Sequence, residues 1–437
     1  MNKLVIVATI FLLLILFVHI LKCDRDVYLD NAATTQESKE VKRSLAKFSK
    51  TYGSMHRGSG KFSVETTKAF GSAIKGIKAF ISAPESDGVL ITKNASDSLN
   101  RLCKLLKITK SSTVINSVMD HNSNDLCWRA AKHKMIEIKP NGTLDITHAM
   151  KLLNSGNIDI VTLPHVSNVT GVINPIGHIF KRAKEIGAIT ILDCSQSFVH
   201  APIDKQAMYA DYVVASSHKA YSPIAFCGIL VGPLDGFKIP DRVGGGEVKI
   251  ATADEIVWSD DPEQRLTCGS ENSAGAVGLH AAIVGIQKSG GLHRVAKHEG
   301  LLMKRLRSRL ERIPTVQMVD VGGPVIGIQS FTVHGIDHTL IATKLAKHKI
   351  SVRTGCFCAG RYVERLLGIN KTDSKKLVQI AKDGGNLPGL VRVSFGDNNT
   401  LSDVDRFCSA LESILPDYLP KTVKPKQKTL QCPLTSL

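Results

Sequence analysis

Residues 188–219 read AITILDCSQSFVHAPIDKQAMYADYVVASSHK. The stretch holds two short apolar, β-branched runs, Ala188–Leu192 and Asp211–Ala215, and polar residues follow each run directly. Runs of this length and composition predict strands buried within a sheet. Ligands bind outside the carboxyl ends of the strands in open α/β sheets. The polar segments Asp193–Gln196 and Ser216–Lys219 therefore stand where a binding site is expected.

The same alternation of strand and helix signals extends along much of the chain. Helical patterns at Glu65–Ile81, Asp97–Leu106 and Ile176–Ile186 lie between further strand-like runs. Those runs are Gly88–Thr92, Thr113–Ser117, Asp159–Leu163 and Gly228–Val231. The alternation predicts an α/β domain with a doubly wound, mostly parallel sheet.

We expect four parts along the chain. Residues 1–23 form a hydrophobic anchor or signal segment, and residues 24–295 form the large domain. A long helical stretch from about Gly275 to Leu310 leads into a smaller α+β domain, residues 296–418, onto which the start of the chain is expected to pack. Residues 419–437 form a loose basic tail rich in Lys and Pro.

The composition is that of a globular protein and not of a disordered or disulfide-rich chain. Of 437 residues, 43% are hydrophobic and 22% charged, and ten cysteines are too few for a disulfide scaffold. The net charge of +17 comes from Lys and Arg spread along the chain, without runs of five or six like charges. With only 5% aromatic residues, this charge favours a solvated basic surface over a nucleic-acid-binding one.

The N-terminus carries a separate hydrophobic signal. Residues Leu4–Leu21 are apolar except for Thr9 and His19, and basic residues stand on both sides. The length is at the lower edge of what spans a bilayer, and no small-residue cleavage motif follows. The pattern favours an uncleaved membrane anchor over a cleaved signal. It implies a membrane-bound or secretory-pathway location, or a plastid-type organelle reached by that route.

Two of the polar segments suggest chemistry with a phosphorylated aldehyde cofactor. Lys219 stands at a strand end beside Ser216 and His218, where its amine can form a Schiff base while its neighbours hold a phosphate. Asp193, 26 positions earlier, can pair with a protonated pyridine nitrogen. Taken singly, the lysine could also be an exposed turn residue and the aspartate a helix N-cap.

Two further motifs could take part in the same chemistry. His121 follows a strand and could stack on a cofactor ring or carry protons, although a lone histidine is more often structural. Cys358 lies in RTGCFCAG, residues 353–360, where the neighbouring Arg353 and the flexible glycines can favour an exposed thiolate. A buried cysteine or half of a zinc site are the alternatives, but no second ligand pair has suitable spacing, so we expect no metal.

Together these motifs resemble those of the class V aminotransferase-fold enzymes, and specifically the group II cysteine desulfurases and selenocysteine lyases. The matching segments follow in the family's order from about residue 27 to 416. They are VYLDNAATT at 27–35, HRG at 56–58, SVETT at 63–67, VSNVTG at 166–171 and NPI at 174–176. The resemblance implies pyridoxal 5′-phosphate as cofactor and the type I fold of enzymes that depend on it.

The resemblance also implies a role for each matching residue. Lys219 would form the Schiff base and Cys358 would be the catalytic cysteine. Arg392 would bind the substrate carboxylate. Asp193 would pair with the nitrogen of the cofactor ring, and His121 would stack on its face. Gln196 and Asn168 would lie near the ring hydroxyl, and Asn168 would also approach the substrate. The phosphate would be bound by Ser96, Ser216 and His218, and by Ser270 of the other subunit of a homodimer.

The activity implied is cysteine desulfuration. L-Cysteine would yield L-alanine and a persulfide on Cys358, for transfer to an acceptor protein in iron–sulfur cluster assembly or a related process. The RTGCFC loop is also similar to that of molybdenum cofactor sulfurases. A sulfurase, a selenocysteine lyase, another class V lyase or epimerase, and an inactive membrane-tethered homologue remain alternatives. Cys356 could assist Cys358 or form a disulfide with it.

Overall fold

The computed structural model describes residues 25–417. The apolar run 4–21 and the basic tail 419–437 lie outside the described residues. Within residues 25–417, no helix has both the length and the apolar character needed to cross a membrane.

The large domain is built on a sheet of seven strands in the order β2-β8-β7-β6-β5-β3-β4. Neighbours from β7 through to β4 run parallel, and β8 runs antiparallel to both β2 and β7. The predicted, mostly parallel sheet is thus confirmed. The strands are β2 (Gly88–Thr92), β3 (Thr113–Ser117), β4 (Lys132–Ile136), β5 (Ile160–Pro164), β6 (Ile189–Asp193), β7 (Tyr212–Ser216) and β8 (Gly228–Gly232).

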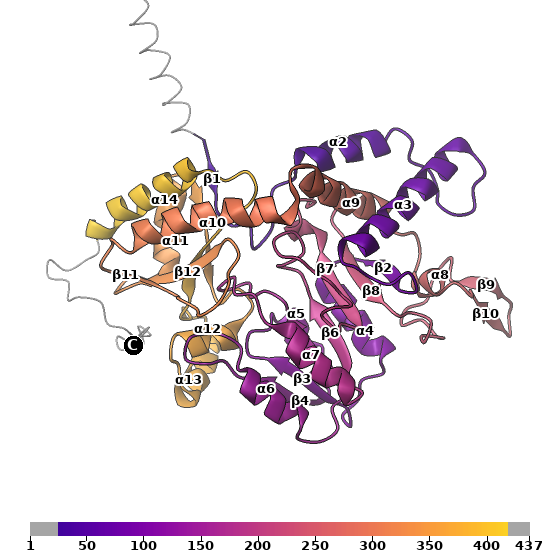
Figure 1. Cartoon of the computed structure of the whole chain (residues 1–437), viewed down its shortest axis with the longest axis horizontal. Coiled ribbons are helices and arrows are strands. Elements are labelled where there is room, and N and C mark those ends of the chain that lie inside the picture. The colour runs from indigo at the N-terminus through magenta and orange to yellow at the C-terminus, as the bar shows by residue number, and fades with distance from the viewer. Residues whose placement is uncertain (1–24, 418–437) are drawn as a thin grey trace, which may run out of the picture.

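Helices cover both faces of this sheet (Figure 1). Successive strand residues point to opposite faces, so Val89 and Ile115 join one core while their neighbours Leu90 and Val114 join the other. The first core includes residues of α2 (Lys39–Phe48), α3 (Lys61–Phe80), α6 (Ile146–Leu153), α7 (Ile176–Glu185) and α9 (Ser273–Lys288). The second includes residues of α4 (Ala95–Leu105) and α8 (Pro262–Leu266).

The predicted long helical stretch over 275–310 is interrupted once. It forms two helices, α9 and α10 (Gly291–Leu310), separated by Ser289 and Gly290. Gly290 and Gly291, the first residue of α10, have φ of 110° and 70°, which glycine adopts without a steric penalty and which would break a right-handed helix in its interior. Helical periodicity on both sides of the break concealed it from the sequence pattern.

The smaller domain is an antiparallel sheet in the order β11-β12-β15-β14, packed with helices α10, α11 and α14. Strand β1 (Val27–Tyr28) pairs with β13 (Ile350–Ser351), so the beginning of the described chain belongs to this domain's core. The remaining elements are β11 (Val316–Met318), β12 (Ile328–Val333), α11 (His338–Lys347), β14 (Arg353–Gly355), β15 (Leu390–Ser394) and α14 (Leu401–Ile414).

One segment of the smaller domain leaves its sheet and packs on the large domain. It contains α12 (Gly360–Leu366) and α13 (Lys371–Lys382), and its residues Phe357, Tyr362 and Leu377 share the first core of the large domain. The loop that carries Cys358 is therefore held between the two domains.

Two local elements remain. The short helix α5 (Ser123–Leu126) follows β3. The hairpin of β9 (Val248–Ala251) and β10 (Ile256–Trp258) projects from the large domain at the right of Figure 1.

A buried ion pair also joins the two domains. His200 Nδ1 lies 2.5 Å from Glu299 Oε1, and the second carboxylate oxygen accepts a hydrogen bond of 2.9 Å from the amide of Gly327. Burial disfavours the charged imidazole, but Glu299 outweighs this and raises the pKa of His200.

Candidate active site

A cavity of about 580 Å³ lies where the strand ends of the large domain face the smaller domain. The predicted site residues that line it are Ser96, His121, Asn168, Asp193, Gln196, Ser216, His218, Lys219, Cys358 and Arg392. Ser270 is exposed and does not line the cavity of its own chain. Residues from distant parts of the sequence thus meet at the edge of the sheet, as the strand-end argument predicted.

The floor of the cavity is formed by the ends of β6 and β7. Asp193 is the last residue of β6, and its Oδ1 accepts a hydrogen bond of 2.8 Å from the amide of Ser195. Lys219 ends the single turn of 3₁₀ helix that follows β7. Burial lowers the pKa of Lys219, while the charge of Asp193 opposes this shift. A lysine with a lowered pKa is a better nucleophile at neutral pH.

His121 is held in one orientation by the start of α5. Its Nδ1 accepts a hydrogen bond of 3.1 Å from the amide of Ser123, and the hydroxyl of Ser123 lies 3.0 Å from the same nitrogen. Burial, with the nearby positive charge of Lys219, lowers the pKa of His121 to about 4. The imidazole is therefore neutral near pH 7 and presents a flat, uncharged ring to the cavity.

One end of the cavity is suited to a phosphate. The N-terminus of α4, an 11-residue helix, lines it with Asn94, Ala95 and Ser96. The free amides and dipole of a helix start favour an anion. The buried hydroxyls of Ser195 and Ser216 also line the cavity, and neither has a hydrogen-bond partner among the described residues. A buried hydroxyl without a partner is costly, so these two groups point to a ligand that accepts their hydrogen bonds.

The other end of the cavity carries two arginines that share one carboxylate. Arg392 lies 3.2 Å from Asp30 Oδ1 through its Nη2, and its Nη1 donates to the carbonyl oxygen of Asn168 at 2.8 Å. Burial, opposed by Asp30, lowers the pKa of Arg392 to about 10, which leaves it charged at neutral pH. Arg353, which we expected beside the cysteine thiol, directs its guanidinium to Asp30 Oδ2 at 2.7 Å.

The loop of Cys358 is fixed by its backbone. Phe357 and Cys358 both have positive φ values, 53° and 56°. The carbonyl oxygen of Cys358 accepts a hydrogen bond of 2.6 Å from the amide of Asn122, and that of Phe357 accepts one of 2.7 Å from Asn168 Nδ2. Cys356 and Cys358 are both exposed free thiols, and only Cys358 lines the cavity.

Two predicted site residues are also bonded to the backbone, and several site residues were missed. The Gln196 amide donates to the Ala32 carbonyl at 2.7 Å, and the Asn168 amide donates to the Phe357 carbonyl in the cysteine loop. The sequence reasoning did not identify Asp30, Ser195 or Ser123 as site residues. Asp30 stood within the motif at 27–35, but nothing in the pattern indicated that two arginines pair with it. No group of His, Cys, Asp and Glu in residues 25–417 could hold a metal ion.

The residues present fit pyridoxal phosphate. The volume is within the range of small-molecule sites. One cavity brings together the amine of Lys219, the carboxylate of Asp193 and the neutral ring of His121. The start of α4 and the unsatisfied hydroxyls of Ser195 and Ser216 line the same cavity and can bind a phosphate. The arginine pair at the other end leaves a cation for a substrate carboxylate.

Comparison with known proteins agrees with this reading. A family model described as aminotransferase class-V matches residues 27–407. The probable cysteine desulfurase of Pyrococcus abyssi is 31% identical over 89% of this chain and 94% of the relative. That of Streptomyces coelicolor is 29% identical over 89% of this chain and 92% of the relative.

Solved structures show the same architecture. The apo structure of a cysteine desulfurase from Thermococcus onnurineus NA1 has a TM-score of 0.78 and 29% identity, covering 90% of this chain and 95% of the other. An Escherichia coli cysteine desulfurase in its S-sulfonic acid form has a TM-score of 0.76 at 24% identity, covering 90% and 96%, and supports the fold.

The unsatisfied hydroxyl of Ser216 gives a direct test of cofactor binding. We predict that Ser216→Ala raises the dissociation constant for pyridoxal phosphate at least about tenfold, because a hydrogen bond to a charged group is worth about 1.5–3 kcal/mol. Spectroscopic titration of the apoprotein measures this constant. Ser222→Ala is the matched control, since Ser222 is equally buried and unpartnered but does not line the cavity. Equal effects of the two substitutions would contradict the assignment.

Proposed function

Because this chain belongs to the class V aminotransferase family, and within it to the cysteine desulfurases, we propose that it removes sulfur from L-cysteine with pyridoxal phosphate as cofactor. The products are L-alanine and a persulfide on Cys358. The observation that carries this proposal is that an exposed cysteine, Cys358, and a half-buried lysine, Lys219, line the same cavity. The two are close enough for the charge of Cys358 to act on the pKa of Lys219.

Each end of the cavity has a separate task in this proposal. The start of α4, with Ser96, Ser216 and His218, holds the cofactor phosphate. Arg392 binds the substrate carboxylate at the opposite end, where its Nε–H has no partner among the described residues. The cofactor is thereby held by its phosphate and the substrate by its carboxylate, and fixing the reacting groups relative to each other lowers the entropic part of the barrier.

Proton transfer falls to Lys219. Bound pyridoxal phosphate supplies an electron sink that makes the Cα proton of an attached amino acid acidic. Lys219 Nζ, with its lowered pKa, takes and returns that proton near neutral pH. Asp193 would pair with the nitrogen of the cofactor ring, and the neutral imidazole of His121 would lie on the face of the ring and exclude water there.

Cys358 accepts the sulfur. Its Sγ thiolate attacks the substrate sulfur, an S–S bond forms, and the substrate Cβ–S bond breaks with its electron pair returning to the carbon skeleton. That skeleton gains protons and leaves as alanine. One cysteine and one thiol become one alanine and one persulfide, so no external oxidant or reductant is needed.

We predict that the protein releases alanine and sulfide in equal amounts from L-cysteine in the presence of a thiol reductant. Lys219→Ala and Cys358→Ser should each lower the turnover at least about a hundredfold, because each removes a reacting group. Alanine analysis and a colorimetric sulfide assay measure the products. Cys268→Ser is the control, since Cys268 is an exposed thiol that does not line the cavity.

The same assay separates the alternatives. Full turnover of L-cysteine by Cys358→Ser would exclude the persulfide route. Bound cofactor without products from L-cysteine would redirect the search to selenocysteine or another amino acid. Turnover of Cys356→Ser shows whether the neighbouring thiol assists.

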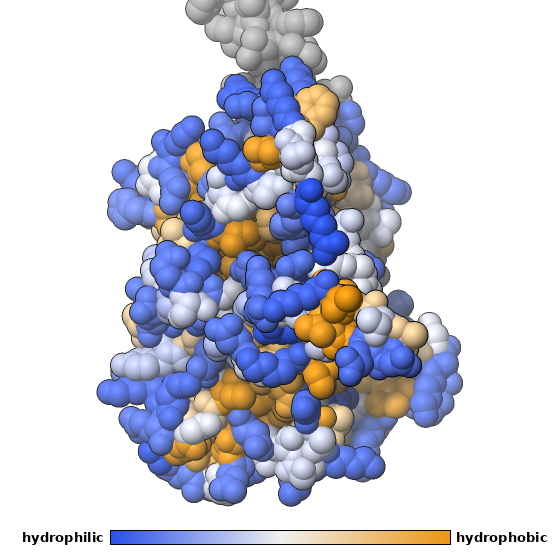
Figure 2. All heavy atoms as spheres, turned by 90° about the vertical axis from the view of Figure 1, so that its right-hand side faces the viewer, coloured by the Kyte–Doolittle hydropathy of each residue, from blue (hydrophilic) through white to orange (hydrophobic). Residues whose placement is uncertain are grey.

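A homodimer is the second part of the proposal. Large apolar side chains are exposed on one side of the large domain, and Figure 2 shows hydrophobic surface on the face that looks right in Figure 1, the side from which the β9–β10 hairpin projects. The exposed large apolar residues of the segment 224–257, which includes this hairpin, are Ile224, Phe226, Ile239, Val243, Ile250, Ile256 and Val257. Phe226 also lines the cavity and contacts His218, so this face continues to the site. Ser270, exposed and outside its own cavity, is available there for the phosphate of a second copy.

We predict that Ile250→Glu combined with Ile256→Glu shifts the protein to the 47.3 kDa monomer, because charges then enter an apolar interface. Sedimentation velocity measures the mass. Val378→Glu, which places the same charge on an equally exposed apolar position of α13, should leave the dimer intact. A wild-type monomer at micromolar concentration would contradict the proposal.

The N-terminal apolar run supports a membrane-bound location as a third part. We predict that the full chain stays in the membrane pellet after an alkaline carbonate wash, whereas a chain that begins at Arg25 is released. The physical reason is the 18-residue apolar length of Leu4–Leu21. Release of both chains would exclude the anchor, and loss of the first residues from the mature protein would indicate a cleaved signal.

A further inference from the structure

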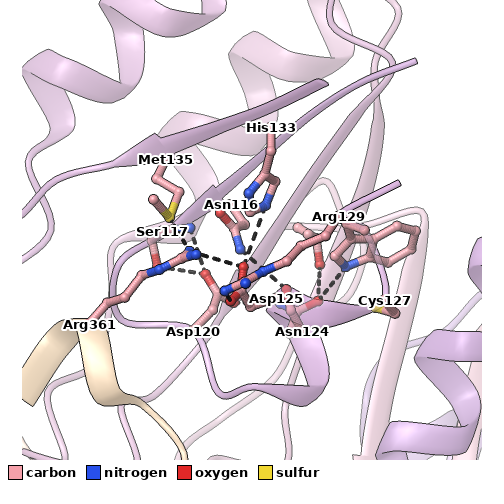
Figure 3. Close-up of polar contacts among 12 residues, drawn as sticks. Asn116, Ser117, Asp120, Asn124, Asp125, Cys127, Arg129, His133, Met135 and Arg361 are labelled. Carbon is pink, nitrogen blue, oxygen red and sulfur yellow. Dashed lines mark hydrogen bonds and ion pairs between the residues drawn. The ribbon is translucent and has the colours of Figure 1, made fainter. Parts of the chain in front are cut away.

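The side chain of Asp125 lies at the junction between α5 and the loop of Cys358. Asp125 is 5% exposed. Its Oδ2 accepts a hydrogen bond of 2.6 Å from Arg129 Nη2, and its Oδ1 accepts one of 3.1 Å from Arg361 Nη1. His133 Nε2 lies 3.7 Å from Oδ1. Figure 3 shows Arg361 reaching in from α12 and Arg129 approaching from the opposite side.

The two arginines differ in what they connect. Arg129 is four residues from Asp125, so that contact stays within one local segment. Arg361 is 236 residues away and is the second residue of α12, the helix that follows the cysteine loop. Only three positions separate it from Cys358. The Asp125–Arg361 contact therefore links the reactive loop to the large domain.

The same short segment holds the loop at a second point. The amide of Asn122 donates to the carbonyl oxygen of Cys358, and Asn122 immediately follows His121. Residues 122 and 125 thus hold the loop at Cys358 itself and at Arg361, three residues after it. The cavity histidine and the thiol are fixed by one segment.

That segment rests on a rigid base. Asn124 Nδ2 donates to Asp120 Oδ1 at 2.6 Å, and Asn124 Oδ1 accepts from Trp128 Nε1 at 3.1 Å. Asp120 also accepts hydrogen bonds from the amide and hydroxyl of Ser117. All four side chains are buried, so α5 has little freedom to follow a displaced loop.

We propose that Asp125 and Arg361 are a pair of positioning residues that set the direction of Cys358 toward the substrate sulfur. Cys358 has a positive φ, a strained conformation that persists only when its surroundings hold it. Asp125, which is itself buried, neutralises the partly exposed Arg361 and so fixes the end of the loop. Without the carboxylate, Arg129 and Arg361 repel each other and the loop turns away. The proposal rests on the sulfur-accepting role of Cys358.

The contacts farther along α12 cannot replace this pair. Arg365 pairs with Glu137 at 3.0 Å, and the Tyr362 hydroxyl donates to the Gly142 carbonyl at 2.7 Å. Both hold α12 on the large domain, but each starts from a residue farther from Cys358. They preserve the fold while the loop itself gains freedom.

The test compares holoenzyme variants by kinetics and by thiol chemistry. Asp125→Asn and Arg361→Gln should each lower kcat about tenfold and leave KM within about twofold, because a small misplacement of a reacting group affects the chemical step more than carboxylate binding. The double variant should be no slower than either single variant, since both changes break one contact. Arg361→Lys should recover part of the rate.

A second readout does not depend on turnover. The rate of Cys358 alkylation by iodoacetamide, followed by peptide mass spectrometry, should rise at least about threefold in Asp125→Asn and Arg361→Gln. Arg129→Gln is the matched control, because it removes the other guanidinium from Asp125 without touching α12. It should change neither kcat nor the alkylation rate.

The outcomes separate this proposal from the proposed function. Unchanged kcat and alkylation in Arg361→Gln, or a double variant about a hundredfold slower, would overturn the positioning role. If the wild type makes no alanine from cysteine, the desulfurase proposal fails and the alkylation rates alone decide the positioning role. Should Asp125→Asn not fold, the half-exposed Arg361 carries the test with Arg361→Gln and Arg361→Lys.

Discussion

The carboxylate of Asp30 is the constraint on which the site depends. It is 6% exposed and holds Arg392 with one oxygen and Arg353 with the other. Without it, the buried charge of Arg392 would have no carboxylate partner and would stand beside the second guanidinium group, that of the exposed Arg353. The residues beside it extend the connection, since the Asn31 side chain and the Ala32 amide bond to Ser394, and the Ala32 carbonyl accepts from Gln196. A single motif thus ties the smaller domain's sheet to the cavity floor.

The cavity binds its two expected anions, a substrate carboxylate and a cofactor phosphate, with different kinds of groups. The arginine end stays cationic because Asp30 compensates the burial of Arg392. The opposite end relies on helix amides and hydroxyls, and burial leaves His218 with a pKa of about 4 and therefore neutral. Between them, Lys219 is made less basic by burial. An amino acid bound to a phosphorylated cofactor finds one anion site at each end and a basic amine in the middle, which favours a single orientation.

The sequence predicted those parts of the site that follow from strand periodicity. Asp193 and Ser216 are the last residues of β6 and β7, and Lys219 comes three residues after the end of β7, so their common position needed only the parallel sheet. Edge strand β4 was missed because KHKMI has no apolar, β-branched run, and its residues are largely half-buried. The break at Gly290 was missed because a backbone conformation leaves no trace in hydrophobic spacing.

Ion pairs between residues far apart in the chain could not be predicted from the sequence either. Asp30 and Arg392 are 362 positions apart, and Asp125 and Arg361 are 236 apart. The family resemblance brought Arg392 and Cys358 into the site, but it could not show which carboxylates hold them. Those partners depend on the packing of two domains, which no local pattern encodes.

The pairing of β1 with β13 has a consequence for the folding of the protein during translation. During translation, Asp30 leaves the ribosome early, and Lys219 emerges long before Arg392, which is 173 positions later. At synthesis rates of about 5–20 residues per second, the interval is roughly 9–35 s. During that time the nascent large domain has its cavity floor but no opposite wall, and the edge of β1 has no strand to pair with. The smaller domain of each new chain therefore forms from its first and its last segments. The active-site cavity is complete only after the last strands have been synthesised.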